Sequence, residues 1–139
     1  MSARYPVITR TLLILMIVFY LFAGYNHFAN PSFYYTIIPP YLSDWAGSIN
    51  ILAGIAEILL AILLIPKSTR KTAAWGIIIM LIAFIPSHIY FIQKGTFQLG
   101  SLTINPAIAW VRLLVIHPLL ILWAWMVIRT VPTNLAPVL

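Results

Sequence analysis

The sequence has no cysteine, and only two of its 139 residues, Asp44 and Glu57, are acidic. Without cysteine the chain cannot form disulfides, iron–sulfur clusters or cysteine zinc sites, and it cannot carry out thiol chemistry itself. Charged residues make up 7% of the sequence and hydrophobic residues 63%. Since soluble domains carry roughly 25% charged residues, this composition indicates an integral membrane protein, which we treat as a single domain over residues 1–139.

Four apolar runs are each long enough to cross a bilayer, which takes about 20 helical residues. We predict an all-α bundle of four transmembrane helices, at about 7–25, 46–65, 73–92 and 107–128. The first run resembles a signal peptide, but no small-residue cleavage site follows it, so we expect a retained helix. Between the last two helices, Thr96–Thr103 is a candidate for a short β-hairpin.

The basic residues are distributed unevenly over the predicted loops. One side of the membrane would hold Arg4, Arg10, Lys67, Arg70, Lys71 and Arg129. The other side would hold Lys94 and Asp44. The positive-inside rule therefore predicts that both termini and the loop 66–72 are cytoplasmic. Because topology accounts for the net charge of +6, we do not interpret that charge as a sign of nucleic-acid binding.

Glu57 lies near the middle of the second apolar run. A carboxyl group at that depth costs at least about 2.5–3.5 kcal/mol, so a partner, a proton or a ligand must offset the cost. The helical period places Asn50, Gly54 and Ala61 on the same stripe as Glu57. Small residues permit close helix packing in membranes, so we expect Glu57 to face protein rather than lipid.

Further polar residues occupy the same half of the bundle, between the midplane and the outer face, and this asymmetry predicts a polar cavity open to the outside. In the first helix, Tyr20, Gly24 and His27 share one face. In the fourth, Arg112 and His117 are five residues apart, which separates them by about 140° on a straight α-helix. The candidates for a ligand or proton site are Asn26, His27, Asn50, Glu57, His88, Arg112 and His117.

Five of these candidates also have a structural explanation. Glu57 and Arg112 would form a buried ion pair that holds the bundle together. His117 would bond a neighbouring helix, and His88 would bond the carbonyl groups that Pro86 leaves free. His27 would be solvated near the membrane surface. None of the histidines shows the local spacing of a metal motif, so we expect no metal site.

The chain resembles the DoxX-like family of small four-helix membrane proteins. The motifs that carry this resemblance are, in order, Ala23–Phe28, Ile37–Leu42, Gly54–Glu57, Pro66–Ala74, Phe84–Tyr90 and Trp110–Trp123. The resemblance implies a four-helix bundle in a bacterial inner membrane, with Glu57 and Arg112 in the shared core. It also implies an association with respiratory or thiosulfate–quinone redox systems, with thiol or oxidative-stress complexes, or with assembly and trafficking.

Two functions are therefore predicted side by side. In the first, a redox-associated accessory protein binds a quinone or another small lipophile. Glu57 and His117 would then exchange protons, while Arg112 and His27 would orient carbonyl oxygens. In the second, the chain is a non-catalytic subunit or assembly factor that binds a membrane-protein partner or a second copy of itself. The sequence contains no haem or flavin motif, and transport is less favoured because no inverted repeat is visible.

Overall fold

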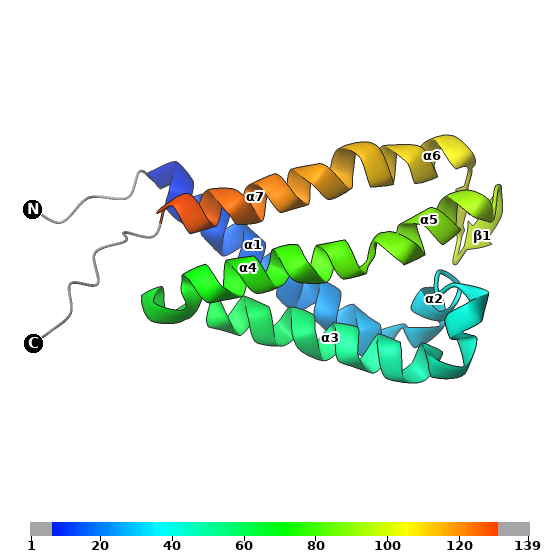
Figure 1. Cartoon of the computed structure of the whole chain (residues 1–139), viewed down its shortest axis with the longest axis horizontal. Coiled ribbons are helices and arrows are strands. Elements are labelled where there is room, and N and C mark those ends of the chain that lie inside the picture. Colours follow the sequence, from blue (N-terminus) through cyan, green and yellow to red (C-terminus); the bar gives the residue numbers. More distant parts are fainter. Residues whose placement is uncertain (1–6, 131–139) are drawn as a thin grey trace, which may run out of the picture.

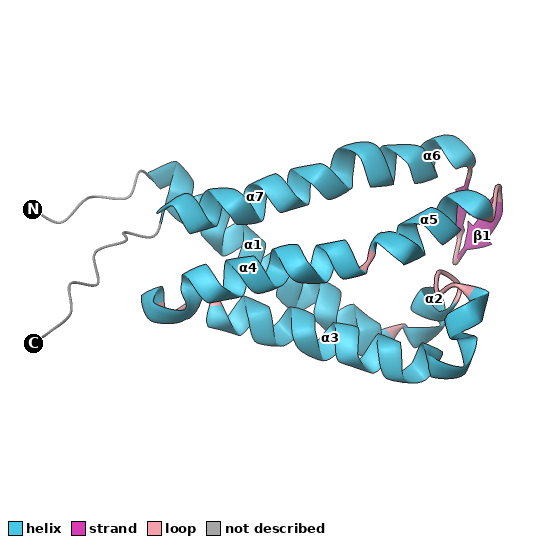
Figure 2. Cartoon of the chain, viewed as in Figure 1, coloured by secondary structure: helices cyan, strands magenta, loops and turns pink. Residues whose placement is uncertain are grey.

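The computed structural model describes residues 7–130 and is almost entirely helical (Figures 1 and 2). Four helical segments are long and apolar enough to cross a membrane, which confirms that part of the predicted fold. Arg4 lies outside the described residues. The four segments are α1 (Val7–Ala29), α3 (Ala46–Leu63), α4 with α5 (Lys67–Ala83, Ile85–Gln93), and α6, η2 and α7 (Pro106–Val111, Arg112–Ile116, His117–Thr130).

Two of these segments differ clearly from the predicted ranges. The first helix continues past residue 25 to Ala29, so His27 lies within it. The third begins at Lys67 rather than at 73, and it is interrupted at Phe84. The interruption has a cause in the sequence, because Pro86 lacks an N–H and its ring clashes with the carbonyl four residues earlier. In the first turn of the new helix α5, the missing N–H costs nothing.

The helices pack tightly at one end of the bundle and separate toward the other. Helix α1 lies along α3 and α4 lies along α7, while α1 and α7 contact each other over a short stretch only. The larger apolar core fills the end where α1 begins and α7 ends (Figure 1). Its fully buried members include Met16, Ala61, Leu64, Ile77 and Ala124.

A small cap covers the opposite end. It consists of α2 (Pro31–Tyr35), the 3-10 helix η1 (Pro40–Trp45), and a hairpin of β1 (Phe97–Leu99) and β2 (Leu102–Ile104). The two strands are antiparallel, with Phe97 opposite Ile104, so the predicted hairpin is confirmed. A second core, formed by Ile37, Phe91, Leu99, Ile104 and Ala109, joins this cap to α5 and α6.

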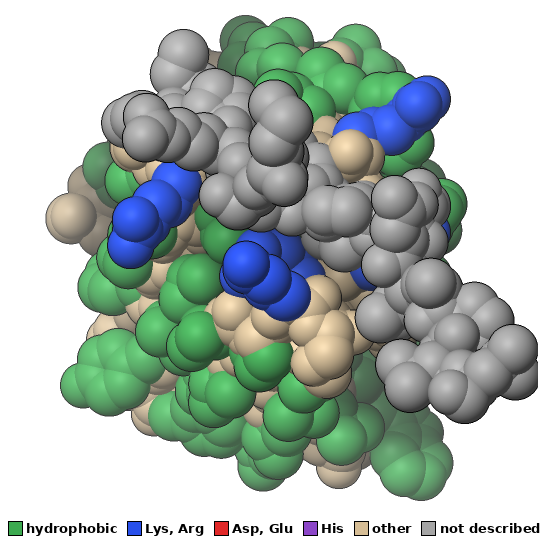
Figure 3. Space-filling view, turned by 90° about the vertical axis from the view of Figure 1, so that its left-hand side faces the viewer, with side chains coloured by type: hydrophobic (Ala, Val, Ile, Leu, Met, Phe, Trp, Pro, Cys, Tyr) green, Lys and Arg blue, Asp and Glu red, His purple; other side chains and the backbone are tan. Residues whose placement is uncertain are grey.

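The charges and the outward-facing side chains follow the sequence pattern. Arg10, the Lys67–Lys71 turn and Arg129 lie at the tightly packed end, where Figure 3 shows Lys and Arg side chains among apolar ones. Asp44, in η1, and Lys94, directly after α5, lie at the capped end. Along the sides of the bundle, large apolar residues such as Phe22, Leu52, Ile79 and Leu119 are more than half exposed. Such a surface is suited to lipid.

Candidate functional site

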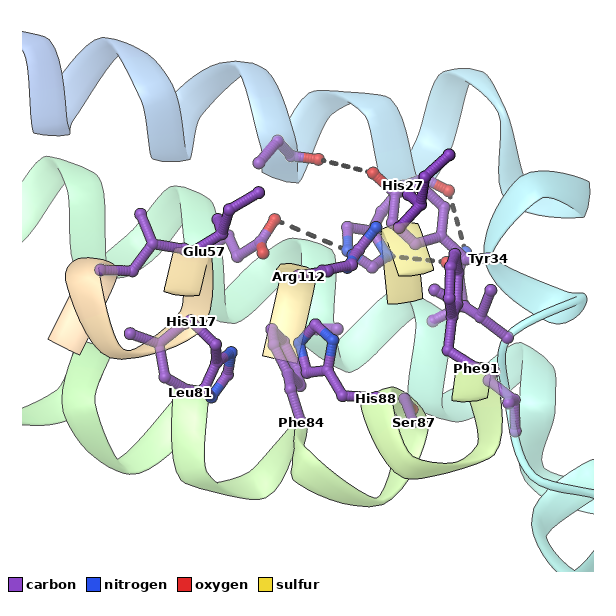
Figure 4. Close-up of a pocket in the computed structure, with 18 of the residues that line it drawn as sticks. His27, Tyr34, Glu57, Leu81, Phe84, Ser87, His88, Phe91, Arg112 and His117 are labelled. Atoms are coloured by element: carbon purple, nitrogen blue, oxygen red, sulfur yellow. Dashed lines mark hydrogen bonds and ion pairs between the residues drawn. The ribbon is translucent and has the colours of Figure 1, made fainter. Parts of the chain in front are cut away.

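A cavity of about 680 Å³ lies where the helices separate, in the half of the bundle below the cap (Figure 4). Its walls are mainly apolar, with side chains from α1, α2, α3, α4, α5, α6, η2 and α7. Its polar lining residues are Tyr20, His27, Tyr34, Asn50, Glu57, Ser87, His88, Asn105, Arg112 and His117. Six of the seven predicted site residues therefore meet in one cavity, and Asn26 is the exception.

The close crossing of α1 and α3 brings the polar residues of these two helices together. A Cβ atom on Gly54 would lie 2.8 Å from His27 Cβ, and one on Gly24 would lie 2.8 Å from the Gly54 carbonyl oxygen. Glycine at both positions thus lets the two backbones meet. Asn50, Gly54, Glu57 and Ala61 are all buried, which confirms that Glu57 faces protein.

Asn50 fixes the orientation and the tautomer of His27. Asn50 Nδ2 donates to the backbone carbonyl oxygen of His27 at 2.8 Å, so Asn50 Oδ1 must be the atom that faces the imidazole. Oδ1 lies 2.7 Å from His27 Nδ1. Since a carbonyl oxygen only accepts, Nδ1 carries the hydrogen, and Nε2 of a neutral His27 is left as an acceptor.

His27 Nε2 points at Glu57, with 3.6 Å between Nε2 and Oε2. A neutral imidazole with hydrogen on Nδ1 and an ionised carboxylate would place two acceptors face to face. One further proton, either on the carboxyl group or on Nε2, would remove this unfavourable contact. The expected ion pair of Glu57 with Arg112 is not formed, because α1 rather than the fourth helix supplies the partner. The expectation that His27 is solvated was also wrong, since its exposed fraction is 6%.

A π-turn aligns Arg112 with His117. The five residues of η2 form one wide turn in which the backbone N–H of His117 donates to the Arg112 carbonyl oxygen. This turn accommodates one residue more than an α-turn, so residues five apart lie on one face. Pro118 follows directly and cannot donate a backbone hydrogen bond, which loosens the α-helical pattern here. Both side chains consequently line the cavity.

Aromatic contacts hold the side chains of this wall in place. The His88 ring packs edge-on against His117, with 4.5 Å between ring centroids. The Arg112 guanidinium lies over the Phe91 ring, 5.0 Å from its centroid. The structure gives the guanidinium no hydrogen bond or ion pair with any residue in 7–130. His88 makes no bond to the carbonyl groups freed by Pro86 within the same range, contrary to the structural explanation above.

Tyr34 is a lining residue that the sequence did not single out. Its ring stacks on His27, with centroids 3.6 Å apart and planes 20° apart. Asn26 lies behind it and donates to the Tyr34 hydroxyl at 3.0 Å, so Asn26 positions Tyr34 rather than lining the cavity. Burial raises the pKa of the Tyr34 hydroxyl, which keeps it protonated. The sequence predicts a loop around Tyr34, and a predicted loop has no periodic pattern that could have revealed this role.

Several buried polar atoms at the cavity have no hydrogen-bond partner among the described residues. They are Tyr20 Oη, Glu57 Oε2 and His117 Nε2. Buried polar groups are normally satisfied, so Tyr20 Oη and His117 Nε2 call for a partner that the described residues do not provide, whereas Glu57 Oε2 has His27 Nε2 3.6 Å away. Within residues 7–130 no three His, Cys, Asp or Glu side chains gather closely enough to hold a metal ion.

The comparisons with known proteins identify a family but not an activity. No curated protein and no solved structure matches the chain. A family described as a domain of unknown function, DUF8561, matches residues 16–128. This range includes every residue that lines the cavity. The chain therefore belongs to the DUF8561 family.

Proposed function

We propose that this protein binds a quinone or another small lipophile in the cavity between its helices, as a redox-associated accessory protein of a bacterial cytoplasmic membrane. The observation that carries the proposal is the cavity itself. Its volume of about 680 Å³ falls within the roughly 300–1,000 Å³ of small-molecule sites. Apolar walls with a few converging polar groups are typical of such sites.

The membrane location and orientation are part of the proposal. Four apolar segments and the outward-facing large apolar side chains support insertion in a bilayer. The cations at the tightly packed end support a cytoplasmic location for both termini. In that orientation the cavity lies in the outer half of the membrane, where a lipophile could enter from the outer leaflet between the separated helices.

The polar groups of the cavity suit a ligand with an oxygen-bearing head group. A quinone carries carbonyl oxygens on opposite sides of its ring. The Arg112 guanidinium offers N–H donors toward the cap, and the Tyr20 hydroxyl, which has no hydrogen-bond partner among the described residues, offers a donor deeper in the bundle. The redox association rests on the resemblance to DoxX-like proteins. That resemblance is part of the proposal, whereas membership of DUF8561 by itself implies no activity.

Native mass spectrometry of the protein released from gently solubilised membranes tests the proposal. We expect a co-purifying lipophile on the wild-type chain. Ala53→Phe should remove it, because Ala53 lines the cavity and the larger side chain would occupy the space. Ile55→Phe is the matched control, since Ile55 lies on the same helix and is half exposed on the outer surface.

The result also separates the two predicted functions. Loss of the lipophile from Ala53→Phe but not from Ile55→Phe would support a ligand site. A wild-type bundle that carries no small molecule but a second protein in fixed stoichiometry would instead favour the non-catalytic subunit or assembly factor. In that case the buried polar groups would serve to hold the bundle together.

A further inference from the structure

The charge balance of the cavity narrows the class of its ligand. Arg112 is the one lining side chain that stays charged over the whole physiological pH range. The only acidic lining residue, Glu57, faces His27 rather than Arg112. The guanidinium would be balanced only if the His27–Glu57 pair carried a net negative charge.

The hydrogen bonds of Asn50 determine the net charge of the His27–Glu57 pair. Asn50 places the hydrogen on His27 Nδ1, so the pair needs one further proton to avoid two facing acceptors. If that proton is on Glu57, both side chains are neutral. If it is on His27, His27 carries a charge of +1 and Glu57 a charge of −1. The net charge of the pair is zero in both cases.

None of the other described residues around the cavity offers a negative charge. Tyr20 and Tyr34 face it from α1 and α2, and phenols are neutral near pH 7. His88 and His117 face it from α5 and α7, and protonation of either would only add positive charge. Asp44 is exposed in η1 and does not line the cavity. The cavity thus carries a net charge of at least +1.

We propose that the cavity takes a single-chain lipophilic monoanion, with its anionic head group on Arg112. This inference rests on the proposed lipophile site and specifies its ligand. A guanidinium binds a carboxylate through two parallel hydrogen bonds, and the interaction is strong where water is excluded. A neutral carbonyl would accept a hydrogen bond but would leave the positive charge uncompensated in an apolar environment.

The volume of the cavity favours a ligand with a single alkyl chain. About 680 Å³ holds roughly twenty groups of the size of a water molecule, at about 30 Å³ each. A head group with one alkyl chain of moderate length fits this space. Two long chains would not both lie inside this space, so we propose a single-chain occupant rather than the bulk lipid of the membrane.

The test uses the full chain in nanodiscs of phosphatidylcholine, which have no net charge. Three probes are compared by native mass spectrometry of the released protein: laurate, its uncharged methyl ester, and a decyl-substituted benzoquinone. We expect the wild-type chain to retain laurate roughly 10- to 100-fold better than the ester, as a charge-assisted pair would give. Arg112→Gln should abolish this preference yet still retain the ester, which shows that the cavity remains formed.

Two further variants sharpen the assignment. Arg112→Lys keeps the charge but loses the planar fork, so we expect an intermediate preference for laurate. Arg129→Gln removes a cation from the same helical segment at the opposite end of the bundle, and it should leave the preference unchanged. Equal retention of laurate by Arg112→Gln and wild type would overturn the inference.

The remaining outcomes distinguish the inference from the proposed function. Retention of the quinone or the ester but not of laurate would support the proposed lipophile site and overturn the inference that its ligand is a monoanion. Retention of none of the three probes would overturn both. Displacement of laurate when phosphatidylglycerol is added to the nanodiscs would show that a membrane lipid head group occupies Arg112, which would overturn the single-chain assignment.

Discussion

The backbone N–H of His117 donates to the carbonyl oxygen of Arg112, five residues earlier, and this bond closes the π-turn η2. On a regular α-helix the two side chains would point about 140° apart, and only one of them could face the cavity. The extra residue of the π-turn removes this conflict. π-turns of this kind occur frequently at functional sites, and here the turn builds one wall of the candidate site.

A single-residue deletion tests the π-turn. Leu114 lies in the middle of η2 and is 63% exposed. Its deletion should convert the turn to a regular α-turn, with the arginine and histidine four apart and still on one face. We therefore expect little change in thermal unfolding of the detergent-solubilised protein, followed by circular dichroism.

Deletion of Leu122 is the control, because it removes a residue from the regular helix α7. Everything after it would rotate by about 100°, which turns the buried Ala124 and Val127 away from the core. The loss of packing should cost more than about 3 kcal/mol. If the two deletions lower the stability equally, η2 does not contain one residue more than a regular α-helical turn.

A second prediction concerns the crossing of α1 and α3. Gly54→Ala would place a methyl group 2.8 Å from both His27 Cβ and Phe28 Cε2, so the helices must separate. We expect a loss of about 1–3 kcal/mol, as is usual for overpacking. Gly47→Ala is the control in the same helix, because its nearest neighbour, the Tyr35 hydroxyl, would be 3.9 Å away. Unfolding in detergent should show a destabilised Gly54→Ala and an unchanged or more stable Gly47→Ala.

The sequence predicted the parts of this site that depend on the period of a single helix. The stripe of Asn50, Gly54, Glu57 and Ala61 follows from a spacing of three or four residues, and the structure buries all four. The partner of Glu57 could not be predicted in this way. It depends on how α1 rotates against α3, which the contact between Gly24 and Gly54 determines.

The alignment of Arg112 with His117 was not predictable for a different reason. Pro118 indicated that the helix is disturbed, but a proline allows a kink, a break or a π-turn, and the sequence does not select among them. The cavity as a whole was anticipated from the clustering of polar residues at one depth. Tyr34 was missed because it lies in the short helix α2, within a segment that the sequence predicts as a loop, and it reaches the site through its stacking on His27.

A third prediction tests Asn50 as the residue that orients His27. Asn50→Ala removes the acceptor for His27 Nδ1–H and the donor to the His27 carbonyl, and both groups are buried. Leaving a buried group without its partner costs about 1–3 kcal/mol, so the variant should lose at least about 2 kcal/mol in total. Ser48→Ala, at an exposed position of the same helix, should be neutral in the same unfolding measurement. If the two variants are equally stable, Asn50 does not hold His27 in its orientation.

The last prediction concerns the proton shared by His27 and Glu57. An apolar environment disfavours separated charges, so we expect this proton on Glu57. Infrared spectroscopy at neutral pH should then show the stretch of a protonated carboxyl group. Because the chain has only two acidic side chains, the assignment is simple: Glu57→Gln should remove the band, whereas Asp44→Asn, at an exposed position, should leave it.

The stability of the same variants provides an independent check on this proton. The amide of Glu57→Gln can donate to His27 Nε2 as a protonated carboxyl would, so this variant should keep its stability within about 1 kcal/mol of wild type. Glu57→Leu leaves His27 Nε2 without a partner and should lose about 1–3 kcal/mol. If the wild type lacks the carboxyl band and Glu57→Gln is strongly destabilised, Glu57 is ionised and the proton is on His27 Nε2. The pair would still have no net charge, and the cavity would still require an anion at Arg112.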